Sequence, residues 1–259
     1  MTASDDRPEV EIRRGERPHV ATISFRRGEN NFFNLELLDM IVSALEELAA
    51  TDTRAVVLQS AGRHFCAGMS FGPSNFEEGA GPHIYDSVVP RLFAQPLPVV
   101  AAIDGAAIGG GFGLAMVPDF RVTTPRARFA ANFAKIGVSH GFALSLTLPR
   151  IIGEQRAAEL LLTGRRISGT DAVEMGVCDR LAEPQEVSRH AHDLAEEIAT
   201  AAPLAVASIR RTLRAPLLAA LPSALTQERG QQRTLRITGD FREGVRAYAE
   251  RRPATFTSS

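Results

Sequence analysis

The sequence predicts an α/β protein whose C-terminal part is helical. Short apolar strand patterns alternate with helical patterns and glycine turns up to about residue 200. From Pro203 onward the patterns are helical, and we expect no further strand there. The sequence therefore predicts a core domain over residues 1–200, followed by a C-terminal helical region over residues 201–259.

The predicted elements are short and closely spaced. The strand patterns cover residues 10–12, 19–25, 55–59, 99–103 and 120–122. One helix is expected over residues 35–50, where aliphatic side chains recur at helical spacing. The segment 72–90 is rich in glycine, proline, serine and acidic residues, which predicts a surface loop.

Composition gives no support for binding to nucleic acid or to a membrane. The net charge of −1 gives no reason to expect nucleic acid or an anionic membrane surface. Residues 99–117 are nearly all apolar, but they contain Asp104 and several glycines, which favours a buried strand, turn and helix over a membrane span.

The spacing of Cys66 and Cys178 fits neither a disulfide framework nor a metal site. With no signal-peptide pattern in the polar, acidic start of the chain, we expect a reducing, cytoplasmic location.

Two glycine-containing segments carry the strongest functional signal. They are residues 64–69 (HFCAGM) and residues 106–115 (AAIGGGFGLA). Glycine is costly to order, so three in a row indicate that something approaches the backbone closely. The apolar residues 114–117 that follow predict a buried helix, and free N–H groups at a helix start bind anions or an oxygen that is gaining negative charge. One N–H from each turn would form a two-donor oxyanion hole.

These two segments resemble the paired signatures of the crotonase superfamily, the enoyl-CoA hydratase/isomerase family. Residues 98–105, 161–177 and 240–253 resemble further signatures of that family in the same order, so the resemblance runs from about residue 9 to 256. It implies a crotonase-like spiral of ββα units, with C-terminal helices that pack subunits into a homotrimer or a dimer of trimers. It also implies an acyl-CoA thioester substrate, with CoA as part of the substrate and neither a metal nor a separate cofactor.

The resemblance assigns the two oxyanion donors to the backbone N–H groups of Met69 and Gly110. Because the donors belong to the backbone, they place no demand on the side chain of residue 69. The first turn also contributes His64, Ala67 and Gly68, which the resemblance places near the CoA moiety.

The last helix supplies the other residues expected at CoA. Tyr248 and Arg251 align with an aromatic residue and a lysine that contact CoA in relatives, where both come from the neighbouring subunit. Arginine suits a phosphate at least as well as lysine does. A solvated helix face is the alternative, because Arg246, Arg251 and Arg252 all fall in this helix.

The acid/base residues of a hydratase are absent from their expected positions. Counted from the motifs, the two glutamates of the family fall at Gly113 and Phe133, and neither residue can move a proton. Some relatives without both glutamates place an aspartate eight residues further along, which is Gly141 here. An imidazole in general can gain or lose a proton near neutral pH, and the neighbour of Gly141, His140, is our preferred acid/base. A hydrogen-bonded, inert histidine in a glycine-flanked turn is the alternative.

Three other functions compete with an altered crotonase reaction. One is a non-catalytic acyl-CoA binder, which would keep the fold and the oxyanion hole without turnover. The second is a serine hydrolase, because residues 68–72 (GMSFG) match the G-x-S-x-G pattern around Ser70. That motif needs a strand directly before the serine and a helix directly after it, and the sequence predicts neither. Nucleotide binding is weaker still, because the spacing of the glycines fits neither known phosphate-binding motif.

Overall fold

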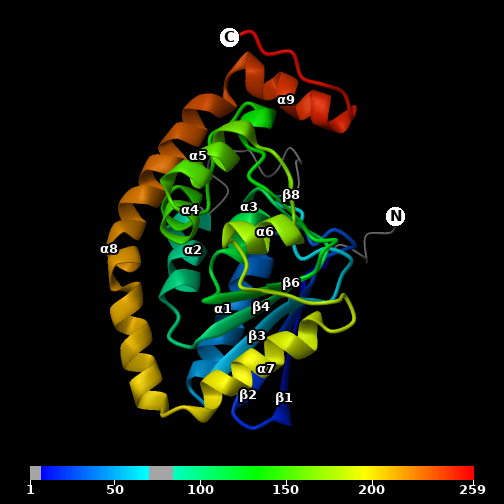
Figure 1. Cartoon of the computed structure of the whole chain (residues 1–259). Coiled ribbons are helices and arrows are strands. Elements are labelled where there is room, and N and C mark those ends of the chain that lie inside the picture. The colour runs from blue at the N-terminus through cyan, green and yellow to red at the C-terminus, as the bar shows by residue number, and fades with distance from the viewer. Residues whose placement is uncertain (1–6, 70–83) are drawn as a thin grey trace.

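The structure, a computed structural model, describes residues 7–69 and 84–259 (Figure 1). It is an α/β fold with a helical C-terminal region, as the sequence predicts. The expected helix is α1, Leu35–Ala49. The five expected strands are β1 (Glu9–Arg17), β2 (Val20–Arg26), β3 (Ala55–Ser60), β4 (Val99–Ile103) and β6 (Phe120–Thr123).

Six of the strands form the main sheet, in the order β1-β2-β3-β4-β6-β9, where β9 is Arg180–Leu181. Strands β1 and β2 pair antiparallel, and all other neighbours are parallel. A second, three-stranded sheet has the order β5-β7-β8. Its strands are Ala106–Ile108, Arg128–Ala130 and Ile167–Ser168.

The alternation of side chains in the parallel strands buries both faces of the main sheet. In β3, Val56 and Leu58 belong to the large core that contains α1, whereas Ala55 and Val57 pack with α7 (Val187–Thr200). Figure 1 shows α7 lying across this second face. Because parallel strands covered on both sides are apolar throughout, β3 and β4 appear in the sequence as continuous apolar runs.

The remaining helices connect and cover these sheets. They are α2 (Ile84–Ala94), α3 (Gly110–Ala115), the short 3-10 helix η2 (Ala134–Ile136), α4 (Leu144–Ile152), α5 (Glu154–Thr163), α6 (Gly169–Met175), α8 (Pro203–Arg236) and α9 (Gly239–Ala249). Among the described helices, none is long and apolar enough to cross a membrane.

The predicted loop over residues 72–90 is wrong in its last part. Residues 70–83 lie outside the described residues, but α2 begins at Ile84 and continues through Pro90. Proline removes one backbone hydrogen bond from a helix, and burial of an apolar stripe compensates for it. The stripe follows the helical spacing i, i+3, i+4, i+7 and consists of Tyr85, Val88, Val89 and Leu92.

The C-terminal helices frame one side of the molecule. Helix α8 runs along its edge, and α9 turns back over the end of the molecule nearest to α5 (Figure 1). The side chains of Leu217, Leu221 and Leu225 on α8 join the same core as α1 and β3. The division into residues 1–200 and 201–259 stays a prediction. The shared core shows that α8 packs on the rest of the chain.

Candidate active site

The two glycine turns follow neighbouring parallel strands, β3 and β4, beyond their carboxyl ends. Cys66 and Ala107 then form a parallel bridge between the two segments. The N–H of Cys66 donates to the carbonyl of Ala106 (2.9 Å), and the N–H of Ile108 donates to the carbonyl of Cys66 (3.0 Å). Met69 and Gly110 each lie three residues beyond this bridged pair, so the bridge sets the two turns in register.

Two glycines with positive φ shape these turns. Gly68 has φ +103°, and a Cβ built there would lie 2.9 Å from the carbonyl oxygen of Ile108. Gly109 has φ +55° and directly precedes α3. The carbonyl of Gly68 accepts from the N–H of Phe33 (2.9 Å), and the N–H of Gly109 donates to the carbonyl of Ala130 (2.8 Å). Any side chain would strain both turns.

The N–H groups of Met69 and Gly110 differ from these neighbours. Within residues 7–69 and 84–259, neither N–H has a hydrogen-bond acceptor. Both residues line an open pocket with an empty volume of about 670 Å³, solvent at its mouth included. Two backbone donors therefore remain available beside a cavity.

Three more of the predicted site residues line the same pocket: Ala67, Gly68 and Tyr248. Phe133, one of the two positions of the missing glutamates, lines it as well. Tyr248 belongs to α9 of the same chain, although the resemblance led us to expect it from a neighbouring subunit. The reason is that α9 turns back from α8 over one end of the molecule (Figure 1), so that Tyr248 lines the same pocket as the glycine turns.

His140 lies outside the described lining of this pocket. Its Nε2 atom is 3.9 Å from Oε1 of Glu228. The Glu228 carboxylate is buried and accepts from the N–H of Ala143 (2.8 Å) and from the N–H (3.1 Å) and hydroxyl (2.5 Å) of Ser145. Ala143 and the preceding Phe142 have positive φ, so Glu228 holds a strained turn at the start of α4.

The sequence analysis missed Glu228, because it lies within a run of polar residues on α8 that carries no local signal. The role predicted for His140 stays a prediction.

His64 and Arg251 also lie outside the described lining of the pocket. Nδ1 of His64 accepts from the N–H of Ala106 (3.2 Å). Burial, helped by the charge of Arg63, lowers the pKa of His64, and Asp104 opposes this only in part. The neutral ring therefore braces the second glycine segment. Arg251 follows α9, where it is exposed and has φ +54°.

Serine, thiol and metal chemistry find less support in the described part of the chain. Ser70 lies outside the described residues, and Ala67 and Gly68 before it belong to no strand. Both cysteines are buried, and burial raises the pKa of each thiol to about 12. The described residues contain no cluster of three His, Cys, Asp or Glu side chains placed to hold a metal ion.

Comparison with known proteins identifies the family. The sequence profile of the enoyl-CoA hydratase/isomerase family matches residues 15–259. The chain belongs to this family. It is 31% identical to the 1,2-epoxyphenylacetyl-CoA isomerase of Escherichia coli K12, over 92% of this chain and 95% of the relative. It is 32% identical to the (E)-benzylidenesuccinyl-CoA hydratase of Thauera aromatica, again over 92% and 95%.

Solved structures of the family share the fold. The crystal structure of an enoyl-CoA hydratase/isomerase from Pseudoalteromonas atlantica T6c superimposes with a TM-score of 0.87 at 26% identity, covering 96% of this chain and 99% of that one. The expected crotonase-like fold is therefore confirmed.

Within this enoyl-CoA hydratase/isomerase chain, Gly113 is the position at which the resemblance predicts a lost glutamate. A Cβ built on Gly113 would lie 2.4 Å from the Cβ of Phe142 and 2.7 Å from the Cγ of its ring. Contacts this short are excluded in proteins, so Phe142 occupies the space that a side chain at residue 113 would need.

A second aromatic side chain fills the place of a side chain at Gly141. A Cβ built there would lie 1.9 Å from the hydroxyl oxygen of Tyr85. Nε2 of Gln232 donates to this hydroxyl at 3.5 Å, and burial, together with the charge of Glu228, raises the pKa of Tyr85 to about 12. Tyr85 lines the pocket and keeps its proton at neutral pH. Because the sequence analysis predicted a surface loop over residues 72–90, it did not identify Tyr85 as a site residue.

Proposed function

We propose that the chain binds an acyl-CoA thioester in this pocket and stabilises the negative charge that develops on the thioester oxygen. The observation that carries the proposal is the parallel bridge between Cys66 and Ala107, which sets Met69 and Gly110 in register beside the pocket. A preorganised N–H donor aimed at such an oxygen typically lowers a barrier by about 3 to 4 kcal/mol. Family membership supports the choice of ligand, because both relatives named above carry a CoA thioester in their names.

The proposed chemistry is not standard two-glutamate hydration, because Gly113 and Phe133 cannot transfer a proton. His140 is the proposed acid/base. Since it does not belong to the described lining of the pocket, this role requires proton transfer through an intervening water or side chain. A homo-oligomer and a cytoplasmic location complete the proposal, and no metal or separate cofactor takes part in it.

A non-catalytic acyl-CoA binder is the second candidate. One observation favours it: among the described lining residues, the titratable side chains are Tyr85, Arg236 and Tyr248, with no carboxylate and no imidazole. Such a pocket suits binding better than proton transfer.

Exchange of the acyl α-protons separates these candidates without knowledge of the final reaction. Butyryl-CoA is incubated with the protein in D₂O, deuterium at Cα is followed by mass spectrometry, and affinity is measured by calorimetry. Catalysed exchange supports the enzyme, because an enolate must form. Binding without exchange supports the binder. Absence of binding contradicts both.

The same assay tests His140. We expect His140→Ala to lose the exchange while the Kd for butyryl-CoA changes less than about twofold, because the ring contacts no oxyanion donor. His190→Ala, on the solvent side of α7, is the matched control and keeps the wild-type rate. An unchanged rate in His140→Ala removes this residue from the mechanism.

A further inference from the structure

The described wall of the pocket is unusually aromatic. The whole chain holds fourteen phenylalanines, two tyrosines and no tryptophan. Six of these side chains line the pocket, and they include both tyrosines: Phe32, Phe33, Tyr85, Phe133, Phe241 and Tyr248. They come from segments far apart in the chain, so the fold concentrates a scarce residue type at one place.

Two of these rings converge on the proposed position of the thioester carbonyl. A Cβ built on Gly110 would lie 2.5 Å from Cζ of Phe33, and one built on Gly109 would lie 3.8 Å from Cζ of Phe133. The ring tips therefore stand against consecutive residues of the second turn, one of which supplies a proposed donor. Acyl carbons next to the carbonyl would lie beside both rings.

The protein holds both rings in place. Phe33 is 3% exposed, and its ring meets that of Phe142 edge to face, with centroids 5.7 Å apart and planes at 70°. Phe133 precedes η2, where its carbonyl accepts from the N–H groups of Ile136 and Val138. Its side chain packs against a small core that contains Phe241. Rings fixed before binding lose little entropy when a ligand arrives.

We propose that the acyl group of the natural thioester carries an aromatic ring close to its carbonyl; this inference rests on the proposed function. Aromatic pairs gain energy from edge-to-face and offset-stacked geometry beyond the burial of apolar area. A saturated ring of the same size, or a linear alkyl chain, gains only the burial. The aromatic wall therefore favours an aryl group over an alkyl group of equal carbon count.

Calorimetry with three stable thioesters tests this preference. Phenylacetyl-CoA and cyclohexylacetyl-CoA share one carbon skeleton and differ only in aromaticity, and octanoyl-CoA is the linear reference with the same number of acyl carbons. We expect phenylacetyl-CoA to bind about fivefold or more tightly than either of the others, the factor that corresponds to one good aromatic contact. Phe133→Leu keeps an apolar side chain and is expected to reduce the preference below about twofold.

Phe256→Leu is the matched control, because Phe256 is half-exposed in a separate surface hollow formed with Thr238 and Ser258. It should keep the full preference, and melting temperatures of both variants verify folding. Equal or tighter binding of cyclohexylacetyl-CoA or octanoyl-CoA to the wild type overturns the aryl preference and leaves the proposed function intact. If none of the three esters binds more tightly than free CoA, the proposed function fails as well.

Discussion

Gly110 is the residue at which the loss of a backbone donor can be compared with the steric effect of an added Cβ. Gly110→Ala adds a Cβ 2.5 Å from Cζ of Phe33 but keeps the N–H. Gly110→Pro adds the same Cβ and two further ring carbons and removes the N–H, at the first position of α3, where proline is tolerated. We expect both variants to be less stable by about 1 to 3 kcal/mol. Exchange of acyl α-protons should be about 100-fold slower in the proline variant than in the alanine variant.

Gly230→Ala is the control for this pair. Gly230 lies inside α8, and no atom lies within 4 Å of a Cβ built there. Alanine should stabilise the helix by up to about 1 kcal/mol and leave the exchange rate unchanged. Equal rates in the proline and alanine variants of Gly110 would contradict the assignment of its N–H as a donor.

His64 makes stability depend on pH in a defined direction. Because its pKa is lowered in the folded state, the stability from the neutral ring is fully present above the unfolded pKa of about 6.5. That stability is lost as the pH falls through the lower, folded pKa. We expect the wild type to lose more stability between pH 7.5 and 5.5 than His64→Asn, which offers the N–H of Ala106 an acceptor that does not titrate.

Urea unfolding at several pH values measures this difference. Gly230→Ala, which changes no titratable group, serves as the control and should give a curve parallel to that of the wild type. Parallel curves for the wild type and His64→Asn would show that His64 is not the group responsible.

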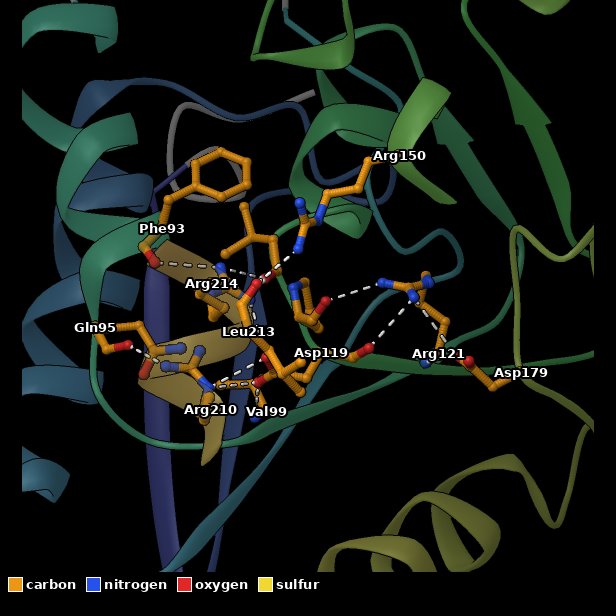
Figure 2. Close-up of polar contacts among 12 residues, drawn as sticks. Phe93, Gln95, Val99, Asp119, Arg121, Arg150, Asp179, Arg210, Leu213 and Arg214 are labelled. Atoms are coloured by element: carbon orange, nitrogen blue, oxygen red, sulfur yellow. Dashed lines mark hydrogen bonds and ion pairs between the residues drawn. The ribbon is translucent and has the colours of Figure 1, made fainter. Parts of the chain in front are cut away.

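At the scale of elements, Asp119 fastens α8 to the amino end of β4. Its carboxylate accepts from the N–H of Val99 (2.9 Å), from Nε of Arg210 (2.9 Å) and from Arg214 (2.9 Å) (Figure 2). Both arginines are mostly buried. Burial lowers the pKa of Arg214, and Asp119 counteracts this effect, whereas Arg210 and Arg121 add to it. Asp119 thus balances a junction that is otherwise positively charged.

Asp119→Asn keeps the shape of the side chain but leaves two buried cations without their carboxylate. We expect the free energy of unfolding to fall by about 3 kcal/mol or more. Glu186→Gln, which breaks the half-exposed pair with Arg189, should cost far less stability, because solvent screens an exposed ion pair. Urea denaturation of both variants measures the contrast. A loss of equal size in the two variants would mean that the junction does not depend on this charge.

For the whole molecule, the sequence was sufficient where the signal was local. Periodicity located α1 and the parallel strands, and the glycines at residues 68 and 109 marked the turns. Contacts between distant segments left no such trace. The hydroxyl of Tyr85 lies over Gly141, and the carboxylate of Glu228 supports the turn at Ala143, yet each pair depends on how α2 and α8 pack around the core.

The placement of Tyr248 in the pocket of its own chain is another contact between distant segments that the sequence does not reveal. It follows from the angle between α8 and α9, which no pattern in the sequence reveals. The six aromatic residues of the pocket wall are likewise scattered along the chain, so only the folded structure brings them together.

One apolar stripe of α8 predicts that the molecule associates with copies of itself. Residues at i, i+4 spacing form it, and its second half, from Leu217 to Leu225, is buried in the core. Its first half is exposed to solvent, since Ile209 is 59% exposed and Leu213 is 62% exposed. An amphipathic stripe that continues past the core needs another surface to cover it. Because the family resemblance implies a homotrimer or a dimer of trimers, we expect light scattering to give three or six times the chain mass of 27.9 kDa.

Replacing Ile209 and Leu213 with glutamate should shift that mass towards a single chain, because two charges would be buried in the contact. Gln227→Glu, on an exposed part of the same helix, adds a charge away from this stripe and should leave the assembly intact. A wild-type protein that scatters as a single chain at micromolar concentration would contradict the prediction. So would a double variant that keeps the wild-type mass, since the exposed stripe would then have no part in assembly.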